Sequence, residues 1–135
     1  MLGEFIRNIL IPLEKDEWII IKTDVNFYTL RLGGFKKRRI ESKDLLHYKA
    51  LNEINYIHKK VTKLYTDDQW LYIFLENDFI IANGWGEINE DGEITQGIYF
   101  KHKKEYDANF FEEDFFELKV DENGNSIIIP PTSDG

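Results

Sequence analysis

Apolar residues recur at a helical spacing through residues 43–65. They stand four, four, three, four and three positions apart, at Leu46, Ala50, Ile54, Ile57, Val61 and Leu64. Such spacing places one apolar stripe along a helix of about 3.6 residues per turn. Ser42 suits the N-cap, and Asp44 suits the first turn, where negative charge is favoured. The pattern predicts one long helix, about 34 Å in length, which can cross a small sheet.

A shorter pattern of the same kind opens the chain. Residues 5, 6, 9, 10 and 13 are apolar, which predicts a short helix that stops near Pro12. Residues 17–22 and 27–32 are instead rich in β-branched and aromatic side chains, and the short polar segment between them predicts a hairpin. The basic residues of 35–40 suit an exposed edge strand, because charged side chains hinder pairing with other chains.

The second half of the sequence has the period of strands. Three apolar segments between residues 70 and 102 are separated by Asn77-Asp78 and by a turn that contains Asp91-Gly92. Both dipeptides tolerate positive φ, so the segment 70–102 is predicted to be a three-stranded antiparallel meander.

The C-terminal part of the chain predicts a further hairpin. Residues 116–120 alternate between apolar and polar, and Asn123-Gly124 leads into an apolar run at 126–129. Residues 110–116 stay open between helix and strand, because Asn109 and Glu112 resemble a capping box.

These elements predict an α+β fold in a single domain. A chain of 135 residues has the size of one domain, which we place at residues 1–131, with a polar C-terminal tail at 132–135. An antiparallel sheet of about five to seven strands is expected to pack against the helix at 43–65. The chain has no cysteine, no long apolar run and no basic leader, so we expect a cytoplasmic protein without a membrane partner.

Charge is distributed unevenly along the sequence. Residues 1–66 contain thirteen lysines and arginines and eight carboxylates, whereas residues 67–135 contain four and seventeen, giving +5 and −13. This asymmetry favours a charged partner. Alternatively, the basic half folds against the acidic half and neutralises it, and the sequence leaves both interpretations open.

Trp85 stands between Gly84 and Gly86, ahead of a run of carboxylates. Glycine within a strand is typical of a bulge, which would turn Trp85 into the core beneath the helix. Alternatively, Trp85 lies in a groove for a partner or ligand, where tryptophan is a strong anchor.

Catalytic and metal-binding patterns are weak. Aligning "EINEDGEI" with a calcium-binding loop at Gly92 places Ile98 where a bidentate carboxylate is required. His47 and His58 would lie about 16 Å apart along a helix. We therefore expect no metal and no cofactor, and we do not favour an enzyme. The basic run at 36–39 favours direct nucleic-acid binding only weakly, because the whole chain carries −8.

Carboxylates and phenylalanines interleave in the acidic half of the chain. Small, acidic, cysteine-free α+β proteins include bacterial immunity proteins, antitoxins and phage-borne inhibitors, and this chain is similar to them in size, charge and composition. We expect a non-catalytic acidic module that neutralises or regulates a basic partner protein of the toxin or nuclease class. The expected partner-binding residues are Trp85, Glu87, Phe111, Glu112, Glu113, Asp114 and Glu117. The alternative is a small-ligand-binding protein or a small enzyme with a pocket between the helix and the sheet.

Overall fold

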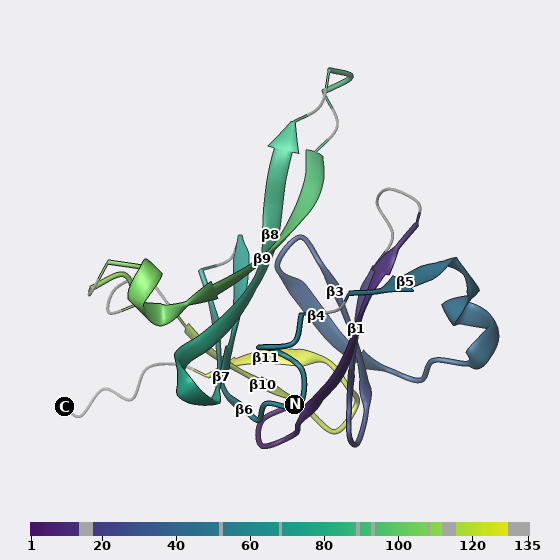
Figure 1. The fold of residues 1–135 in the computed structure, drawn as a ribbon, viewed down its shortest axis with the longest axis horizontal. Coiled ribbons are helices and arrows are strands. Elements are labelled where there is room, and N and C mark those ends of the chain that lie inside the picture. Colours follow the sequence, from purple (N-terminus) through teal and green to yellow (C-terminus); the bar gives the residue numbers. More distant parts are fainter. Residues whose placement is uncertain are drawn as a thin grey trace.

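Two antiparallel β-sheets make up the protein in the computed structural model (Figure 1). The structure describes residues 1–13, 18–51, 53–67, 69–88, 90–92, 94–107, 109–111 and 116–129. The first sheet has the strand order β4-β3-β2-β1-β5, and the second has the order β11-β10-β6-β7-β8-β9. The strands of the first sheet are β1 (Ile6–Pro12), β2 (Ile19–Thr23), β3 (Phe27–Arg31), β4 (Gly34–Arg38) and β5 (Tyr48–Ala50). Those of the second are β6 (Val61–Thr66), β7 (Trp70–Leu75), β8 (Phe79–Ile88), β9 (Ile94–His102), β10 (Phe116–Val120) and β11 (Ser126–Ile129).

The main core contains side chains from both sheets. Ile9 and Ile21 of the first sheet belong to the same buried cluster as Leu64, Ile73 and Ile81 of the second, and each is at most 2% exposed. Full burial of one such side chain stabilises the fold by about 1.5–3 kcal/mol. The two sheets are therefore held together mainly by aliphatic packing.

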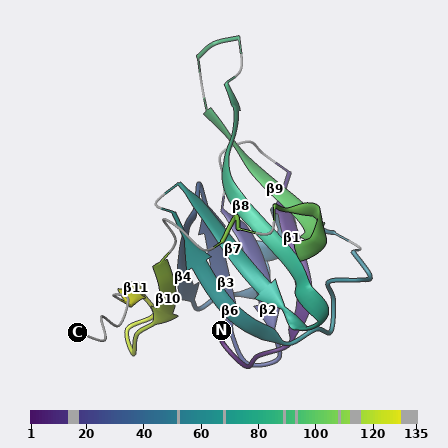
Figure 2. The ribbon, with the colours of Figure 1, turned by 90° about the vertical axis from the view of Figure 1, so that its left-hand side faces the viewer.

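Backbone contacts also link the two sheets. Phe5 forms an isolated bridge with Lys60, and the N–H of Lys37 donates to the carbonyl of Gly124 at 2.8 Å. The hairpin of β8 and β9 extends beyond the body formed by the sheets, as Figure 1 and Figure 2 show from two sides. The pairing of β8 with β9 shifts register between Trp85 and Ile88, so the bulge expected beside Trp85 is confirmed.

The predicted long helix at 43–65 is wrong, and with it the α+β class. The single sheet of about five to seven strands is also wrong, because the described residues form two sheets, of five and six strands. The described residues contain only short 3₁₀ helices, which are η1 (Ser42–His47), η2 (Glu76–Asp78) and η3 (Lys103–Glu105). Leu46 and Ile54, which the helical stripe would bury, are 76% and 84% exposed. His58 has a φ of +68°, a left-handed conformation that an α-helix does not contain. None of the helices in the described part of the chain is long and apolar enough to cross a membrane.

The helix predicted to stop near Pro12 is wrong as well, because these residues form β1. The pairing of β1 with β2 shifts register between Ile6 and Asn8. This irregularity brings Ile6 and Ile9, three positions apart, into the same buried cluster. An unbroken strand would instead bury every second residue, so the bulge gives the strand an apolar spacing that resembles a helix.

The other predicted strands are confirmed. Strands β2 and β3 form the expected hairpin, and β4 is the expected edge strand. Strands β7, β8 and β9 form the meander, and β10 and β11 form the C-terminal hairpin. Residues 109–111 form a turn, whereas 112–115 and the predicted tail at 132–135 lie outside the described residues.

Candidate functional site

The outer face of the second sheet carries a cluster of aromatic rings. Along β7, Leu71 and Ile73 face the main core, whereas Tyr72 and Phe74 belong to a second buried cluster. The ring of Phe111 covers this second cluster, with its centroid 5.2 Å from that of Tyr72 and 4.8 Å from that of Phe74. Both faces of β7 are therefore buried, which explains why its sequence is continuously apolar rather than alternating.

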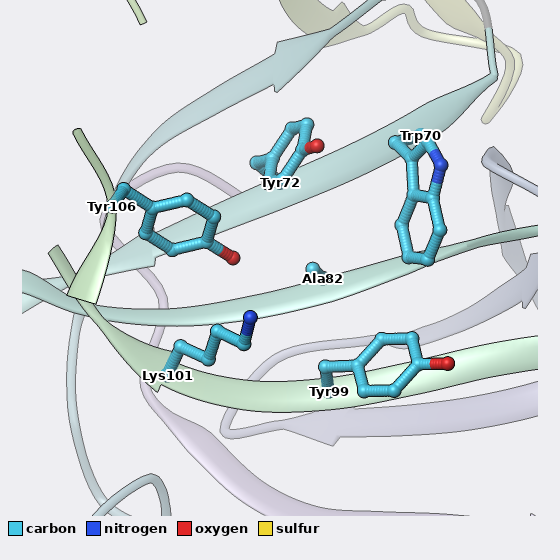
Figure 3. A pocket seen from close by; sticks show the side chains of 6 residues that line it. All are labelled: Trp70, Tyr72, Ala82, Tyr99, Lys101 and Tyr106. Carbon is cyan, nitrogen blue, oxygen red and sulfur yellow. The ribbon is translucent and has the colours of Figure 1, made fainter. Parts of the chain in front are cut away.

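A pocket of about 280 Å³ opens beside this cluster (Figure 3). Ala82 of β8 lies at its centre, and side chains from three neighbouring segments surround it. In Figure 3, the ammonium of Lys101 and the hydroxyl of Tyr106 point toward the space beside Ala82. The residues that line the pocket are Trp70, Tyr72, Ala82, Tyr99, Lys101 and Tyr106.

Two glycines provide the space that the pocket rings occupy. Trp70, Gly84 and Gly97 lie opposite one another on β7, β8 and β9. A Cβ atom on Gly84 would come within 2.7 Å of Cε3 of Trp70, and one on Gly97 would come within 2.7 Å of Cε2 of Tyr99. The centroids of the Trp70 and Tyr99 rings are 5.6 Å apart. The glycines therefore let two large rings lie flat on the sheet and form one side of the pocket.

Burial raises the pKa of two pocket tyrosines, Tyr72 and Tyr106, further above neutral pH. Burial, followed by the negative charge of Glu105, raises the pKa of Tyr106 to about 12. Burial, followed by the charge of Asp67, also raises the pKa of Tyr72. A protonated tyrosine donates a hydrogen bond through its hydroxyl. The two hydroxyls therefore suit recognition rather than proton abstraction.

Lys101 supplies the positive charge of the pocket. Its Nζ lies 5.4 Å from the centroid of the Tyr106 ring, a distance at which the ring attracts a cation. Among the residues that the structure describes, no carboxylate lies within ion-pair distance of Lys101. The pocket thus combines aromatic walls with one cation, Lys101. The negative charges of Asp67 and Glu105 lie close enough to raise the pKa values of its tyrosines.

The structure places three of the expected partner-binding residues, Trp85, Phe111 and Glu117, and these three lie apart from one another. Trp85 is 46% exposed rather than buried in the core, and it follows Gly84 on β8, so it faces away from the pocket side of the sheet. Glu117 is exposed on β10, which is separated from β7 by β6. Phe111 is half-buried in the aromatic cluster, where its ring lies 5.1 Å from that of Tyr106.

The other expected residues are not placed by the structure. Glu112, Glu113 and Asp114 lie outside the described residues, and of Glu87 only the backbone, within β8, is described. Phe110, the neighbour of Phe111, is the more exposed of the two rings, at 38%. Of the predicted site residues whose side chains the structure describes, Phe111 alone lies next to the pocket.

Sequence reasoning missed the residues that line the pocket. The alternation of Trp70 and Tyr72 along one strand is the signal that was present, because residues two apart share a face. Tyr99 and Lys101 show the same alternation on β9. The sequence does not show that these two pairs of residues lie side by side. That depends on how β7 and β9 each pair with β8, which places Ala82 between Tyr72 and Tyr99.

No group of three or more histidine or carboxylate side chains in the described part of the chain is arranged to hold a metal ion. Comparison with protein-family models, with curated proteins and with solved structures gives no match for this chain. The function is therefore argued from the pocket and its surroundings.

Proposed function

We propose that the protein is a non-catalytic binding module that neutralises or regulates another protein, and that the aromatic pocket receives an anchoring side chain of this partner. The observation that carries the proposal is the pocket of about 280 Å³ with four aromatic residues in its lining. Tyrosine and tryptophan are enriched in protein interfaces and dominate their binding energy. Tyr99, 44% exposed, offers such a contact surface directly to solvent.

The size of the pocket fits one inserted side chain. Pockets for drug-sized ligands span about 300–1,000 Å³ and bury most of the ligand surface. A pocket of about 280 Å³ that opens to solvent lies below that range. It has room for one aromatic or large aliphatic side chain from a protein surface. A pocket between helix and sheet, which the small-ligand alternative requires, has no counterpart, because the described residues contain no long helix.

Charge around the pocket supports a basic partner. Asp67 and Glu105 act on the pocket tyrosines, and Asp107 is exposed one residue after Tyr106, whereas Lys101 lines the pocket and Lys103 and Lys104 lie in η3. Residues 67–135 together carry −13. A negative field of this kind speeds encounter with a positively charged protein. A basic toxin or nuclease is a partner of this kind, and the protein would act on it as an immunity protein, antitoxin or inhibitor does.

The chemistry of the lining supports binding rather than catalysis. The ionisable groups of the pocket are Lys101 and three tyrosines, and burial raises the pKa of two of these, Tyr72 and Tyr106. Such groups donate hydrogen bonds and stack against an inserted side chain. The lack of cysteine supports a cytoplasmic location as part of the same proposal.

Capture of the partner tests this function. The wild-type protein, immobilised and exposed to a lysate of its source organism, is expected to retain one basic protein. Tyr99→Ser should lose that protein, because the substitution removes a wall of the pocket. Leu46→Ser is the matched control, since Leu46 is 76% exposed and lies in η1, ahead of β5. Equal retention by both variants, or retention of an acidic protein alone, would contradict the proposal.

A further inference from the structure

A basic hollow of about 360 Å³ lies on the first sheet, away from the aromatic pocket. Phe27 at the start of β3 pairs with Arg38 at the end of β4, so the turn before β3 lies beside the residues that follow β4. This pairing brings three consecutive basic residues to one hollow. The residues that line it are Val25, Asn26, Phe27, Lys37, Arg38, Arg39 and Ile40.

The basic residues of the hollow have no counter-charge among the residues that the structure describes. No carboxylate of that set lies within ion-pair distance of Lys37, Arg38 or Arg39. The acidic residues nearest in the sequence are engaged elsewhere. The carboxylate of Asp24 accepts from the N–H of Phe5 at 2.9 Å, and Glu41 pairs with Lys43 at 3.4 Å. Adjacent cations without counter-charges attract anions.

Arg38 is held in a fixed orientation by its neighbours. Its Nε donates to Oγ1 of Thr29 at 3.0 Å, and its guanidinium carbon lies 4.9 Å from the centroid of the Trp18 ring. Nε accounts for one of the five N–H donors of the guanidinium, which leaves two NH₂ groups for a ligand. Thr29 and Trp18 do not line the hollow, so these contacts hold the guanidinium at the border of the hollow. Its planar fork matches the oxygens of a phosphate.

We propose that this hollow binds a diphosphate group. Three basic residues match the several negative charges of a diphosphate better than the charge of one phosphate, and the hollow is roomy enough for more than one phosphoryl group. Phe27 adds an apolar ring to the lining, on which the base of a nucleoside diphosphate can stack. Free pyrophosphate and a nucleoside diphosphate are thus two sources of one ligand chemistry.

The net negative charge of the protein does not prevent this binding. Most of the excess of carboxylates lies in residues 67–135. Of these, Asp121 and Glu122 belong to the turn whose Gly124 accepts from the N–H of Lys37, but neither is within ion-pair distance of the basic residues of the hollow. At physiological ionic strength, exposed charges are screened beyond about 8 Å. The local charge of Lys37, Arg38 and Arg39 therefore decides what the hollow attracts. This inference is independent of the function proposed for the aromatic pocket.

Titration calorimetry with pyrophosphate, in a buffer without divalent cations, tests the inference. The wild-type protein is expected to bind pyrophosphate at one saturable site, and Arg38→Gln/Arg39→Gln should weaken binding by at least about tenfold. Lys103→Gln/Lys104→Gln is the matched control, because it also removes two adjacent charges but lies in η3 beside the second sheet. The control should stay within about twofold of the wild type.

A second variant and a second ligand sharpen the test. Arg39→Gln alone should weaken binding without loss of stability, because Arg39 is exposed and lacks the contacts that hold Arg38. Adenosine diphosphate that binds more tightly than pyrophosphate would identify a nucleoside diphosphate as the source, and equal affinity would identify free diphosphate.

The inference is overturned if pyrophosphate gives no saturable heat. It is also overturned if sulfate binds as tightly as pyrophosphate, or if both double variants weaken binding equally.

Discussion

The indole ring of Trp70 lies directly over Gly84, its cross-strand neighbour on β8, where a Cβ atom would come within 2.7 Å of ring atom Cε3. The carbonyl oxygen of Gln69 would lie 2.8 Å from the same Cβ atom. The Trp70 ring can therefore occupy this position, and form one wall of the pocket, because Gly84 has no Cβ atom.

Gly84→Ala should displace Trp70 and destabilise the protein. We expect the free energy of unfolding in urea to fall by about 1–3 kcal/mol, as for other overpacked sites. Gly34→Ala is the control, because a Cβ atom there would meet its nearest neighbour, the carbonyl oxygen of Arg31, at an ordinary 3.4 Å. It should change stability by no more than about 0.5 kcal/mol. Equal costs for the two variants would show that Trp70 does not depend on Gly84.

A pair of apolar substitutions distinguishes the two-sheet fold from a helix at 43–65. Leu64 is 2% exposed in β6 and Ile54 is 84% exposed, although a helical stripe would bury both. Leu64→Ala should lower the free energy of unfolding by about 2–5 kcal/mol. Ile54→Ala should change it by less than about 0.5 kcal/mol. Comparable losses in chemical denaturation would favour the helix.

The sequence predicted most strands correctly and mistook β1, β5 and β6 for helices. For β1 and β6 the physical reason is the same. Val61 and Leu64 are both in the main core, and a bulge between Val61 and Lys63 lies within their strand. Ile6 and Ile9 flank a similar irregularity in β1. A spacing of three across a bulge looks the same in sequence as one step along a helix. Register, and therefore the position of bulges, depends on the partner strand, which periodicity within one segment does not reveal.

Strands whose apolar residues are not interrupted by a bulge could be predicted from the sequence. The residues that line the pocket could not. Asn77 and Asp78, both with a φ of 64°, form the tight connection that their residue types favour. Trp70 and Tyr99 come together only because both pair across β8, through Gly84 and Ala82. Their proximity is a property of the sheet rather than of any one segment.

Tyr106 should make stability depend on pH in the alkaline range. Its pKa in the folded protein is raised to about 12, whereas an exposed tyrosine titrates near 10. The stabilisation is therefore complete below about pH 10 and is lost as the pH rises through the folded value. Urea unfolding of the wild type and of Tyr106→Phe from pH 8 upward should show the wild type losing stability more steeply above pH 10. Parallel curves would show that the ring is not buried as described.

Charge beside the pocket should act on the rate of association with the captured partner. Asp107→Lys is expected to slow association several-fold at low salt, and the effect should shrink as salt screens the charges. Glu122→Lys, at an exposed turn of the C-terminal hairpin, makes the same charge change away from the pocket and should have the smaller effect. Stopped-flow kinetics at two salt concentrations measure both. Association that ignores salt and both reversals would contradict an electrostatically guided encounter.

The affinity of the captured partner for Ala82→Leu tests the pocket most directly. Ala82 lies at the centre of the pocket, so a leucine there fills the space that an anchoring side chain would enter. Ala50→Leu makes the same substitution at an exposed position of β5. We predict that Ala82→Leu, shown to be folded by its unfolding transition, binds the partner at least about tenfold more weakly than wild type, equivalent to about 1.4 kcal/mol. Ala50→Leu should bind like the wild type, and unchanged affinity for Ala82→Leu would show that the partner does not use the pocket.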